Sequence, residues 1–316
     1  SHDAKDRIIS ALKPERNRAT QQASLSAISL TNSSIRSRAD EVHAQSGEAR
    51  VDTGSWVTVL QGNSDQDSRG GVAGYGANSH GVIIGADGKL NDETSLGLAL
   101  SHVHTDVDSY TGNDTEVNTN LLSAYGSWAQ GPVFVLGSLS LGKGDNESNR
   151  YILDQHAKGD YDSSVLAADL SAGYQFVLDE HLDWTPTLDA RYSKVKIDRI
   201  SEKGTSAALQ SGGQSLEVFD VGGGFKLQGT SGNWKTKARL MAYYDFAQDD
   251  GNNTSSFVVG EQTFIHTGLP ATKWTYETGV GLEWTQGGYT VGASYDYTHK
   301  AGFHADTFSL TGRYNF

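Results

Sequence analysis

Few side chains in this sequence of 316 residues have the types and spacing that a recognisable reaction needs. His102 and His104 are two positions apart, so they would share one face of a strand. The acids in segments 65–67 and 249–251 are oxygen ligands of the kind that Ca²⁺ takes, but neither segment completes a calcium-binding loop. No G-x-S-x-G, H-E-x-x-H or Walker sequence occurs. We interpret the two histidines as solvated and expect no catalytic, cofactor-binding or metal-binding residues.

The composition excludes other kinds of chemistry and one class of partner. The chain has 25 Lys and Arg against 38 Asp and Glu, and its formal net charge of −13 argues against nucleic-acid binding. It has no Cys, which excludes disulfide bonds, thiolate metal sites and cysteine nucleophiles. The mean hydropathy is −0.47, and no window approaches the ~20 consecutive apolar residues of a membrane helix. These numbers leave open a membrane β-barrel, whose strands need only every second residue to be apolar.

The first 50 residues have the pattern of one polar helix. Pro14 favours a helix start, and neither Pro nor Gly follows until Gly47. A thin stripe of apolar residues recurs at helical spacing among Ser, Thr and Arg: Leu25, Ile28, Ile35, Ala39 and Val42. We predict a helix over residues 15–46 that suits a narrow, polar enclosure. A surface helix or a flexible tail is the alternative.

From Gly54 onward, apolar residues alternate with polar ones, as they do in β-strands. The last strand is the clearest example: Phe308, Leu310, Tyr314 and Phe316 share one face, and Arg313 lies on the other. The same alternation predicts about twelve strands, at 54–62, 76–88, 94–108, 115–130, 132–143, 160–178, 182–198, 215–229, 233–248, 271–286, 287–299 and 303–316.

The connections between these strands alternate in length. Tight turns are predicted at 87–89, 130–132, 178–180, 230–232 and 286–288, and long polar loops at 63–75, 144–159, 199–214 and 249–270. Short turns at one rim and long loops at the other, with an even number of strands, are typical of outer-membrane β-barrels. Closure into a barrel also removes the free edges that so many strands would otherwise expose.

The apolar faces of the predicted strands carry aromatic residues toward both ends. In a soluble barrel or sandwich, the apolar face would line the interior. Here the other face holds many small and charged residues, and aromatic girdles around an apolar band are what surrounding lipid requires. We therefore predict an all-β, antiparallel transmembrane barrel. A soluble sandwich is the alternative.

The order of these features resembles the translocator domain of monomeric type V autotransporters. The resemblance covers nearly the whole chain and rests on the polar helix, the spacer 46–48, the strand opening 54–56, the segment 80–87 and about twelve strands that end in Phe316. It implies an integral protein of the bacterial outer membrane. Residues 1–50 would be a linker whose helix lies in the lumen, and residues 51–316 the barrel. It also implies a passenger N-terminal to residue 1, which the domain secretes to the cell surface.

The last strand resembles the signal that the barrel assembly machinery reads in outer-membrane proteins. We assign this signal to Phe308, Leu310, Tyr314 and Phe316, because an exposed, alternating strand can template pairing before the barrel closes. The implied partners are this machinery, outer-membrane lipid and the passenger. We expect a monomer without a cofactor.

A helix in the lumen would meet charges of the barrel wall. A helix with its side chains is about 10–12 Å wide, and a twelve-stranded barrel is wide enough to hold one. We expect the lumen helix to act through Leu25, Ile28, Asn32, Ile35, Arg36 and Arg38. By strand parity, the lumen-facing charges are Asp169, Asp189, Glu277, Glu283, Asp296 and Arg313. The sequence leaves open which of these acids pair with Arg36 and Arg38.

Some members of the family that the chain resembles cut their own linker inside the barrel, at an Asn-Asn pair in the helix. Here the second Asn is absent, since Ser33 follows Asn32. We therefore expect an intact linker and a protein that is not an enzyme, with self-cleavage at Asn32 as the exception to test.

Two other functions fit a barrel of this kind. One is a stand-alone porin or channel whose N-terminal helix is a plug, and the other is an outer-membrane hydrolase with a site among the long loops. A hydrolase needs a His with acidic or Ser partners at the outer rim, and the sequence offers no such group.

Overall fold

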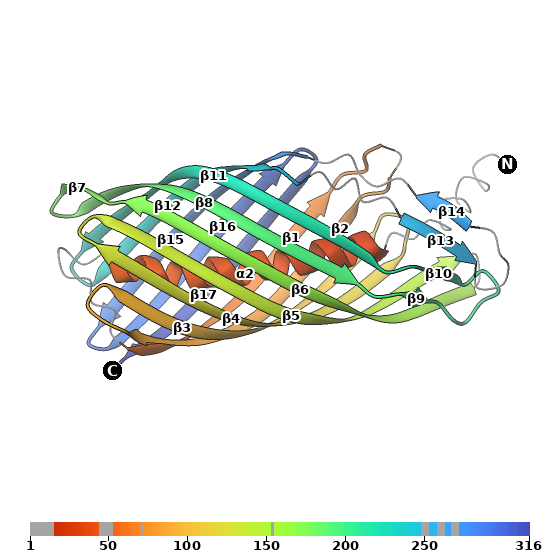
Figure 1. Cartoon of the computed structure of the whole chain (residues 1–316), viewed down its shortest axis with the longest axis horizontal. Coiled ribbons are helices and arrows are strands. Elements are labelled where there is room, and N and C mark those ends of the chain that lie inside the picture. The colour runs from red at the N-terminus through yellow and green to blue at the C-terminus, as the bar shows by residue number, and fades with distance from the viewer. Residues whose placement is uncertain are drawn as a thin grey trace.

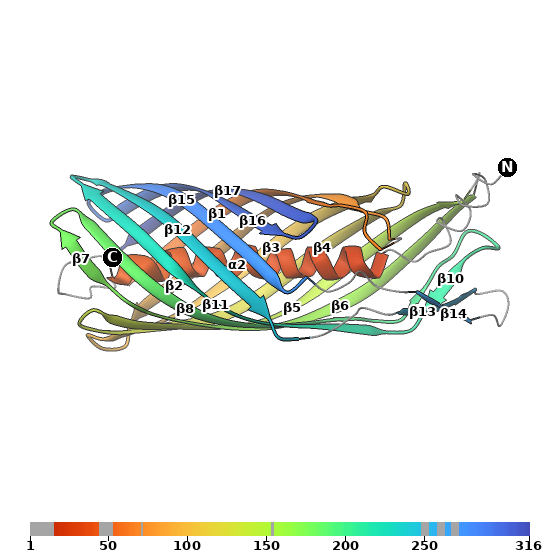
Figure 2. The same ribbon diagram turned by 90° about the horizontal axis from the view of Figure 1, so that it is seen from above.

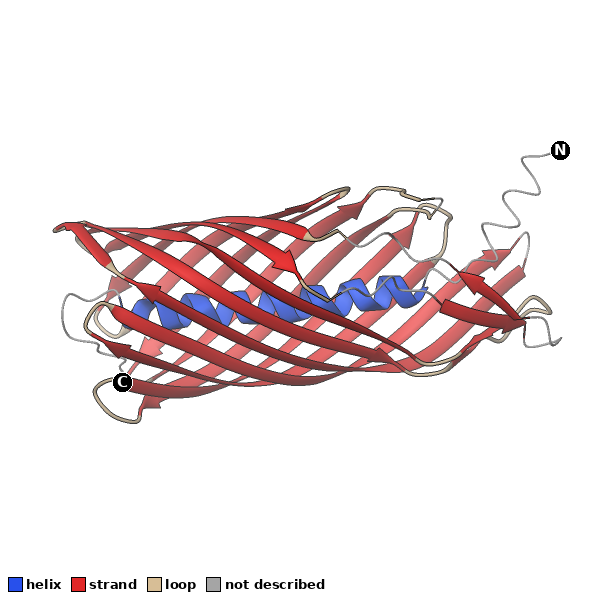
Figure 3. Cartoon of the chain, turned by 45° about the horizontal axis from the view of Figure 1, so that its top comes forward, coloured by secondary structure: helices blue, strands red, loops and turns tan. Residues whose placement is uncertain are grey.

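The computed structural model describes residues 16–43, 53–70, 72–152, 155–247, 253–257, 263–266 and 272–316 of the chain. One long helix, α2 (Arg16–His43), runs along the axis of a β-barrel whose strands wrap around it (Figure 1, Figure 3). Twelve antiparallel strands close the barrel, which confirms the expected fold class and strand number. The predicted last turn of the helix, residues 44–46, lies outside the described residues.

The wall of the barrel is built in chain order, each strand antiparallel to the next. Its strands are β1 (Gly54–Gln66), β2 (Tyr75–Lys89), β3 (Thr94–Ser109), β4 (Asp114–Gln130), β5 (Val133–Ile152), β6 (Gln155–Tyr174), β8 (Leu182–Ile197), β11 (Gln214–Ser231), β12 (Trp234–Asp245), β15 (Trp274–Gln286), β16 (Tyr289–Lys300) and β17 (Phe303–Asn315). A short extra strand, β7 (Phe176–Asp179), prolongs β6 and pairs with β8. Strand β17 pairs with β1 along the whole length of both, so the wall is continuous.

The hairpin of β5 and β6 corrects one predicted loop. The sequence predicts a loop at 144–159, but the two strands stay paired as far as Ile152 and Gln155. In this stretch both faces are polar: Asn146 and Ser148 are buried on the inside, and Asp145 and Glu147 point outward. A strand whose outer face contacts no lipid needs no apolar face, so its alternation disappears from the sequence.

A second sheet of four short strands lies beyond one end of the barrel (Figure 2). Its order is β14 (Thr263–His266), β13 (Asn253–Phe257), β10 (Leu209–Ser211) and β9 (Ile200–Ser201). These strands lie within two stretches that the sequence predicts as long loops, 199–214 and 249–270. A buried ion pair between Arg150 of β5 and Glu202 (2.5 Å) ties this sheet to the β5–β6 hairpin.

The outer surface of the barrel is an apolar band between two aromatic groups. Exposed aliphatic side chains make up the band, among them Val59, Leu98, Leu100, Leu139 and Leu170. At one end Tyr289 contacts Tyr314, with ring centroids 4.8 Å apart, and at the other end Tyr244 contacts Trp274 at 5.2 Å. This is the surface that lipid around a barrel requires. Within the described part of the chain, no helical segment has both the length and the apolar character to cross a membrane.

Glycines in the wall make room for aromatic rings of the neighbouring strand. A Cβ at Gly85 would lie 2.4 Å from the ring of Trp56, and a Cβ at Gly97 would lie 2.3 Å from the ring of Tyr125. Each pair occupies directly opposite positions on adjacent strands. The rings therefore lie over the glycine backbone, where a side chain would otherwise stand. This arrangement keeps bulky residues against the wall and leaves the lumen to the helix.

The helix-filled lumen as the candidate functional site

The helix packs against one side of the lumen and leaves the other side open. Its main contacts are with β2, β3, β4, β5, β6 and β8. Ala19 and Ala23 are buried in one cluster with Val107 and Val117 of β3 and β4. Small side chains let a helix backbone approach its neighbours closely. We call the wall formed by β2–β6 and β8 the packed wall, and the wall formed by β11, β12, β15, β16, β17 and β1 the open wall.

The apolar stripe predicted for the helix faces the packed wall. Ile28 is buried in a cluster with Val165 and Val195, and Leu25 is partly buried against the same cluster. Ile35 is buried in a second cluster with residues of β2–β4 and with Trp56 of β1, the strand of the open wall that borders the packed wall. Burying a side chain of this size stabilises the seated helix by about 1.5–3 kcal/mol.

Hydrogen bonds between hydroxyl groups add to the apolar contacts between the helix and the packed wall. Thr20 Oγ1 lies 2.6 Å from the Tyr161 hydroxyl, and the Thr31 hydroxyl donates to Ser101 Oγ at 2.9 Å. All four side chains are buried. The hydroxyls of Thr20 and Thr31 thus each have a partner on the wall, which a buried polar group requires.

Arg36 joins the C-terminal half of the helix to two acids of the packed wall. Its Nη2 lies 2.8 Å from Asp169 Oδ1, and its Nη1 lies 3.2 Å from Asp189 Oδ2. Tyr243 donates to Asp189 at 2.7 Å, and the Asn32 amide donates to Asp169. One cation of the helix thus pairs with two anions of the wall in a buried layer. Removing one partner of such a buried pair lowers the stability by about 3–5 kcal/mol.

The other predicted acids pair with cations of the barrel and not with the helix. Glu277 accepts from Arg191 at 2.6 Å and lies 3.4 Å from Arg239. Asp296 lies 3.3 Å from Arg239 Nη2, and the second Arg191 partner is Asp220 at 2.9 Å. Strand parity identifies these cations as lumen-facing, but the spacing in the sequence gives no sign of which acid each one reaches.

Glu283 forms the remaining pair of this kind. It accepts from Lys237 Nζ at 2.7 Å, and both side chains are mostly buried in the lumen. Lys237 and Arg239 lie two positions apart on β12, so both point inward.

Arg38 pairs with an acid that the sequence interpretation places elsewhere. Its guanidinium reaches both oxygens of Asp87, at 2.5 and 2.8 Å. Asp87 also accepts from Tyr125 at 2.7 Å, and Tyr125 accepts from Trp56 Nε1 at 2.9 Å. The prediction of a tight turn at 87–89 is wrong, because β2 continues to Lys89. A continued alternation through Asp87 is the signal that would have identified it.

The last strand presents its two faces as the alternation predicts. Phe308, Leu310, Tyr314 and Phe316 are exposed on the outside, by 43–70% of their surface, and Arg313 is buried inside. The lumen therefore holds all six predicted charged residues, and Asp169 and Asp189 among them pair with Arg36 of the helix.

The two histidines examined for chemistry lie on the outer face of β3. His102 is exposed and lies 2.8 Å from Asn120, and the half-buried His104 lies 2.7 Å from Asn118. His104 also lies 3.1 Å from Asp106. Neither histidine is in the lumen, so neither belongs to the site around the helix.

A closed barrel with an apolar outer band and a polar lumen that contains its own N-terminal helix defines an integral outer-membrane protein. The family model of the autotransporter β-domain matches residues 55–296, which are 242 of the 316 residues. The chain therefore belongs to the autotransporter β-domain family and is an outer-membrane translocator domain.

Relatives by sequence include outer-membrane proteins and an esterase. Outer membrane protein A of Rickettsia conorii is 28% identical over 93% of this chain and 16% of the relative. Outer membrane protein B of Rickettsia prowazekii is 26% identical over 85% of this chain and 18% of the relative. Esterase EstA of Pseudomonas aeruginosa is 22% identical over 78% and 40%. The chain thus spans less than a fifth of the length of these rickettsial relatives.

Solved translocator domains share the fold. The translocator domain of NalP from Neisseria meningitidis has a TM-score of 0.73 at 17% identity, over 92% of this chain and 96% of that chain. The β-domain of the Bordetella autotransporter BrkA has a TM-score of 0.61 at 18% identity, over 84% and 100%.

Proposed function

We propose that this domain mediates the secretion of a passenger joined N-terminal to residue 1, and that α2 then closes the pore. The direction of α2 carries this proposal. Near the start of α2, Arg18 donates to the carbonyl of Ala73 in the β1–β2 connection, and near its end Arg38 binds Asp87 beside the start of β1. The N-terminal end of α2 therefore lies at the rim with the longer connections, and its C-terminal end lies at the rim where β1 begins. The rim with the longer connections faces outward in such barrels, so the chain before α2 leads out of the cell.

Two parts of the chain then have separate tasks. Residues 1–50 are the linker and residues 51–316 the barrel that inserts into lipid. The plug acts through Leu25, Ile28, Asn32, Ile35, Arg36 and Arg38. Its buried ion pairs support a stable closed state, because a helix that left the lumen would leave Asp169, Asp189 and Asp87 without their cations.

The drive for secretion in this proposal is passenger folding outside the cell. A folded passenger cannot slide back through a pore about as wide as one helix. The barrel itself is inserted as a monomer by the barrel assembly machinery, which reads Phe308, Leu310 and Tyr314 on the outer face of β17 and Phe316 directly after it. The exposure of these side chains supports that assignment.

The linker stays uncut in this proposal, and the domain is not an enzyme. Cleavage at Asn32 would require its side-chain amide nitrogen to attack its own backbone carbonyl. That nitrogen donates to Asp169, and the backbone of α2 is helical on both sides of Asn32. Mass spectrometry of the chain isolated from membranes tests this directly, since an intact linker predicts one species and cleavage predicts two.

A reporter fusion tests the secretion. A small cysteine-free protein is joined upstream of residue 1, and the reporter exposed on intact cells is measured by protease digestion. We expect protease to remove the reporter while the barrel stays in the membrane. The matched control inserts the same reporter at Gly232, in the short turn between β11 and β12 at the opposite end of the barrel, where it stays protected inside the envelope and leaves the last strand unchanged.

Protection of the upstream reporter on intact cells, with a correctly folded barrel, would contradict the proposal. That result would favour a porin with a helical plug, since a porin has no reason to export its N-terminal side.

A further inference from the structure

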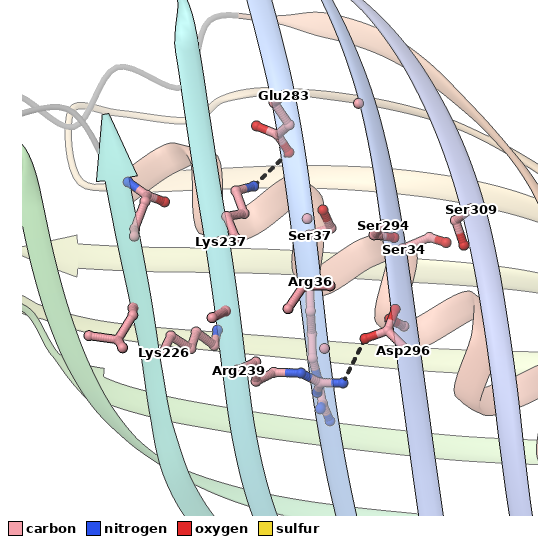
Figure 4. Close-up of a pocket in the computed structure, with 18 of the residues that line it drawn as sticks. Ser34, Arg36, Ser37, Lys226, Lys237, Arg239, Glu283, Ser294, Asp296 and Ser309 are labelled. Atoms are coloured by element: carbon pink, nitrogen blue, oxygen red, sulfur yellow. Dashed lines mark hydrogen bonds and ion pairs between the residues drawn. The ribbon is translucent and has the colours of Figure 1, made fainter. Parts of the chain in front are cut away.

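The side of the lumen that α2 leaves open contains two cavities with charged residues in their lining, and Figure 4 shows the first of them. The first, of about 130 Å³, lies toward the rim with the short turns and is lined by Asp183, Lys226 and Glu283. The second, of about 160 Å³, lies toward the opposite rim and is lined by Asp220 and Lys300. Cavities of this size and polarity hold several water molecules each.

The two cavities meet at one layer of the lumen. Five residues line both of them: Ser33, Arg36, Arg239, Asp296 and Ser309. Arg36 in this layer is turned to the packed wall and its two acids. The barrier on the open side is therefore the pair of Arg239 and Asp296, which Figure 4 shows joined across the lumen face of the wall.

This pair depends on a gap in the strand between its partners. Arg239 on β12 and Asp296 on β16 lie directly opposite the same residue of β15, Gly279. A Cβ at Gly279 would lie 2.3 Å from Asp296 Oδ1. The absence of a side chain at this position thus lets Asp296 reach over β15 to the arginine.

The pair belongs to the wall and does not hold the helix. Arg239 contacts Glu277 and Asp296, both on the open wall. The side chains of Arg239 and Asp296 are 19% and 25% exposed, against 10% and 8% for Arg36 and Asp169. Breaking the more exposed pair, Arg239 and Asp296, therefore leaves the contacts between α2 and the packed wall in place.

We propose that the Arg239–Asp296 pair is a gate between the two cavities, and that its opening lets small hydrated ions pass along the open side of the seated helix. Charged rings and constrictions govern ion passage in other membrane pores in the same way. This activity is separate from secretion, because it needs neither a passenger nor movement of α2.

The test requires a helix that cannot leave the lumen. The Thr31 and Ser101 hydroxyls lie 2.9 Å apart, and the chain has no Cys, so the pair T31C and S101C offers one defined disulfide between α2 and β3. Single-channel conductance in planar bilayers is measured for this cross-linked chain and for D296A and E283A made in it. E283A is the matched control, because it removes a paired carboxylate that lines only the first cavity.

We expect D296A to raise the steady conductance of the cross-linked chain by about threefold or more, and E283A to change it little. G279A, which keeps both charges but displaces Asp296, is expected to raise it as well. A gel-shift assay confirms that each variant forms the folded barrel. Equal conductance of D296A and E283A, or cross-linked wild-type barrels that already conduct as well as D296A, would overturn the gate.

Discussion

The packed wall and the open wall hold the helix in different ways. Against the packed wall, α2 buries alanines, Ile28 and Ile35, and it places Arg36 between two acids. On the open wall, Lys237 and Arg239 pair with acids of the barrel itself, and Glu277 pairs with Arg191 of β8. The packed wall fixes the position of the helix, whereas most charges of the open wall are neutralised within the barrel, beside the two cavities.

This difference separates two functions that a plugged pore must combine. A plug has to be stable, which favours close packing and buried pairs, yet a lumen that admits an unfolded chain has to be polar. Segregating the two requirements on opposite walls satisfies both. The following predictions break or sharpen this contrast, from the largest expected effect to the smallest.

R36A should unseat the helix. It leaves Asp169 and Asp189 buried without their cation, which costs about 3–5 kcal/mol. We expect long open events of large conductance in planar bilayers, where the unchanged chain stays mostly closed. Adding D169N and D189N should restore much of the closed time; if it does not, the charge layer is not what holds the helix.

I28A should weaken the seat through packing alone. Removing this buried side chain costs about 2–4 kcal/mol, whereas S29A, on the cavity-facing side of the same turn, should be nearly neutral. The closed dwell times of the two variants provide the comparison. Similar dwell times for both would mean that the packed wall has no special role.

G85A should destabilise the wall at the ring of Trp56, which also packs in the cluster of Ile35. The new Cβ would lie 2.4 Å from the Trp56 ring, and such overpacking costs about 1–3 kcal/mol. G137A is the control, because the nearest atoms to its Cβ are at 3.9 Å. We expect only G85A to lower the temperature at which the folded barrel band is lost in a gel-shift assay.

E283Q should have the smallest effect. It neutralises one carboxylate of a mostly buried pair on the open wall, but the amide keeps an oxygen that can accept from Lys237, and the adjoining cavity can hydrate the ammonium, so we expect a loss of about 1 kcal/mol. The stability of the folded band and the closed time should both stay close to those of the unchanged chain. A loss as large as that of R36A would remove the distinction between the two walls.

The sequence predicts the architecture well because the barrel is encoded by local alternation. Period-2 patterns identify the twelve strands and the inward position of Arg313, and a continuous stretch without Gly or Pro identifies α2. The pattern fails at 144–159, where both faces of the β5–β6 hairpin are polar.

The pairing of charges was not accessible from the sequence. Arg38 reaches Asp87 and Arg36 reaches Asp169 because of the height of α2 in the lumen and the tilt of the strands, and neither quantity is local. Asp87 also precedes Gly88 and Lys89, a combination that favours a turn when it is taken alone. Only the pairing of β2 with β1 and β3 shows that the strand continues.

Single-channel conductance of the refolded chain, compared with that of a variant lacking residues 1–47, tests most directly whether α2 closes the pore. We expect a small or flickering conductance for the whole chain and a large, steady one after the deletion. Equal, large conductances for both would contradict a lumen closed by its own helix.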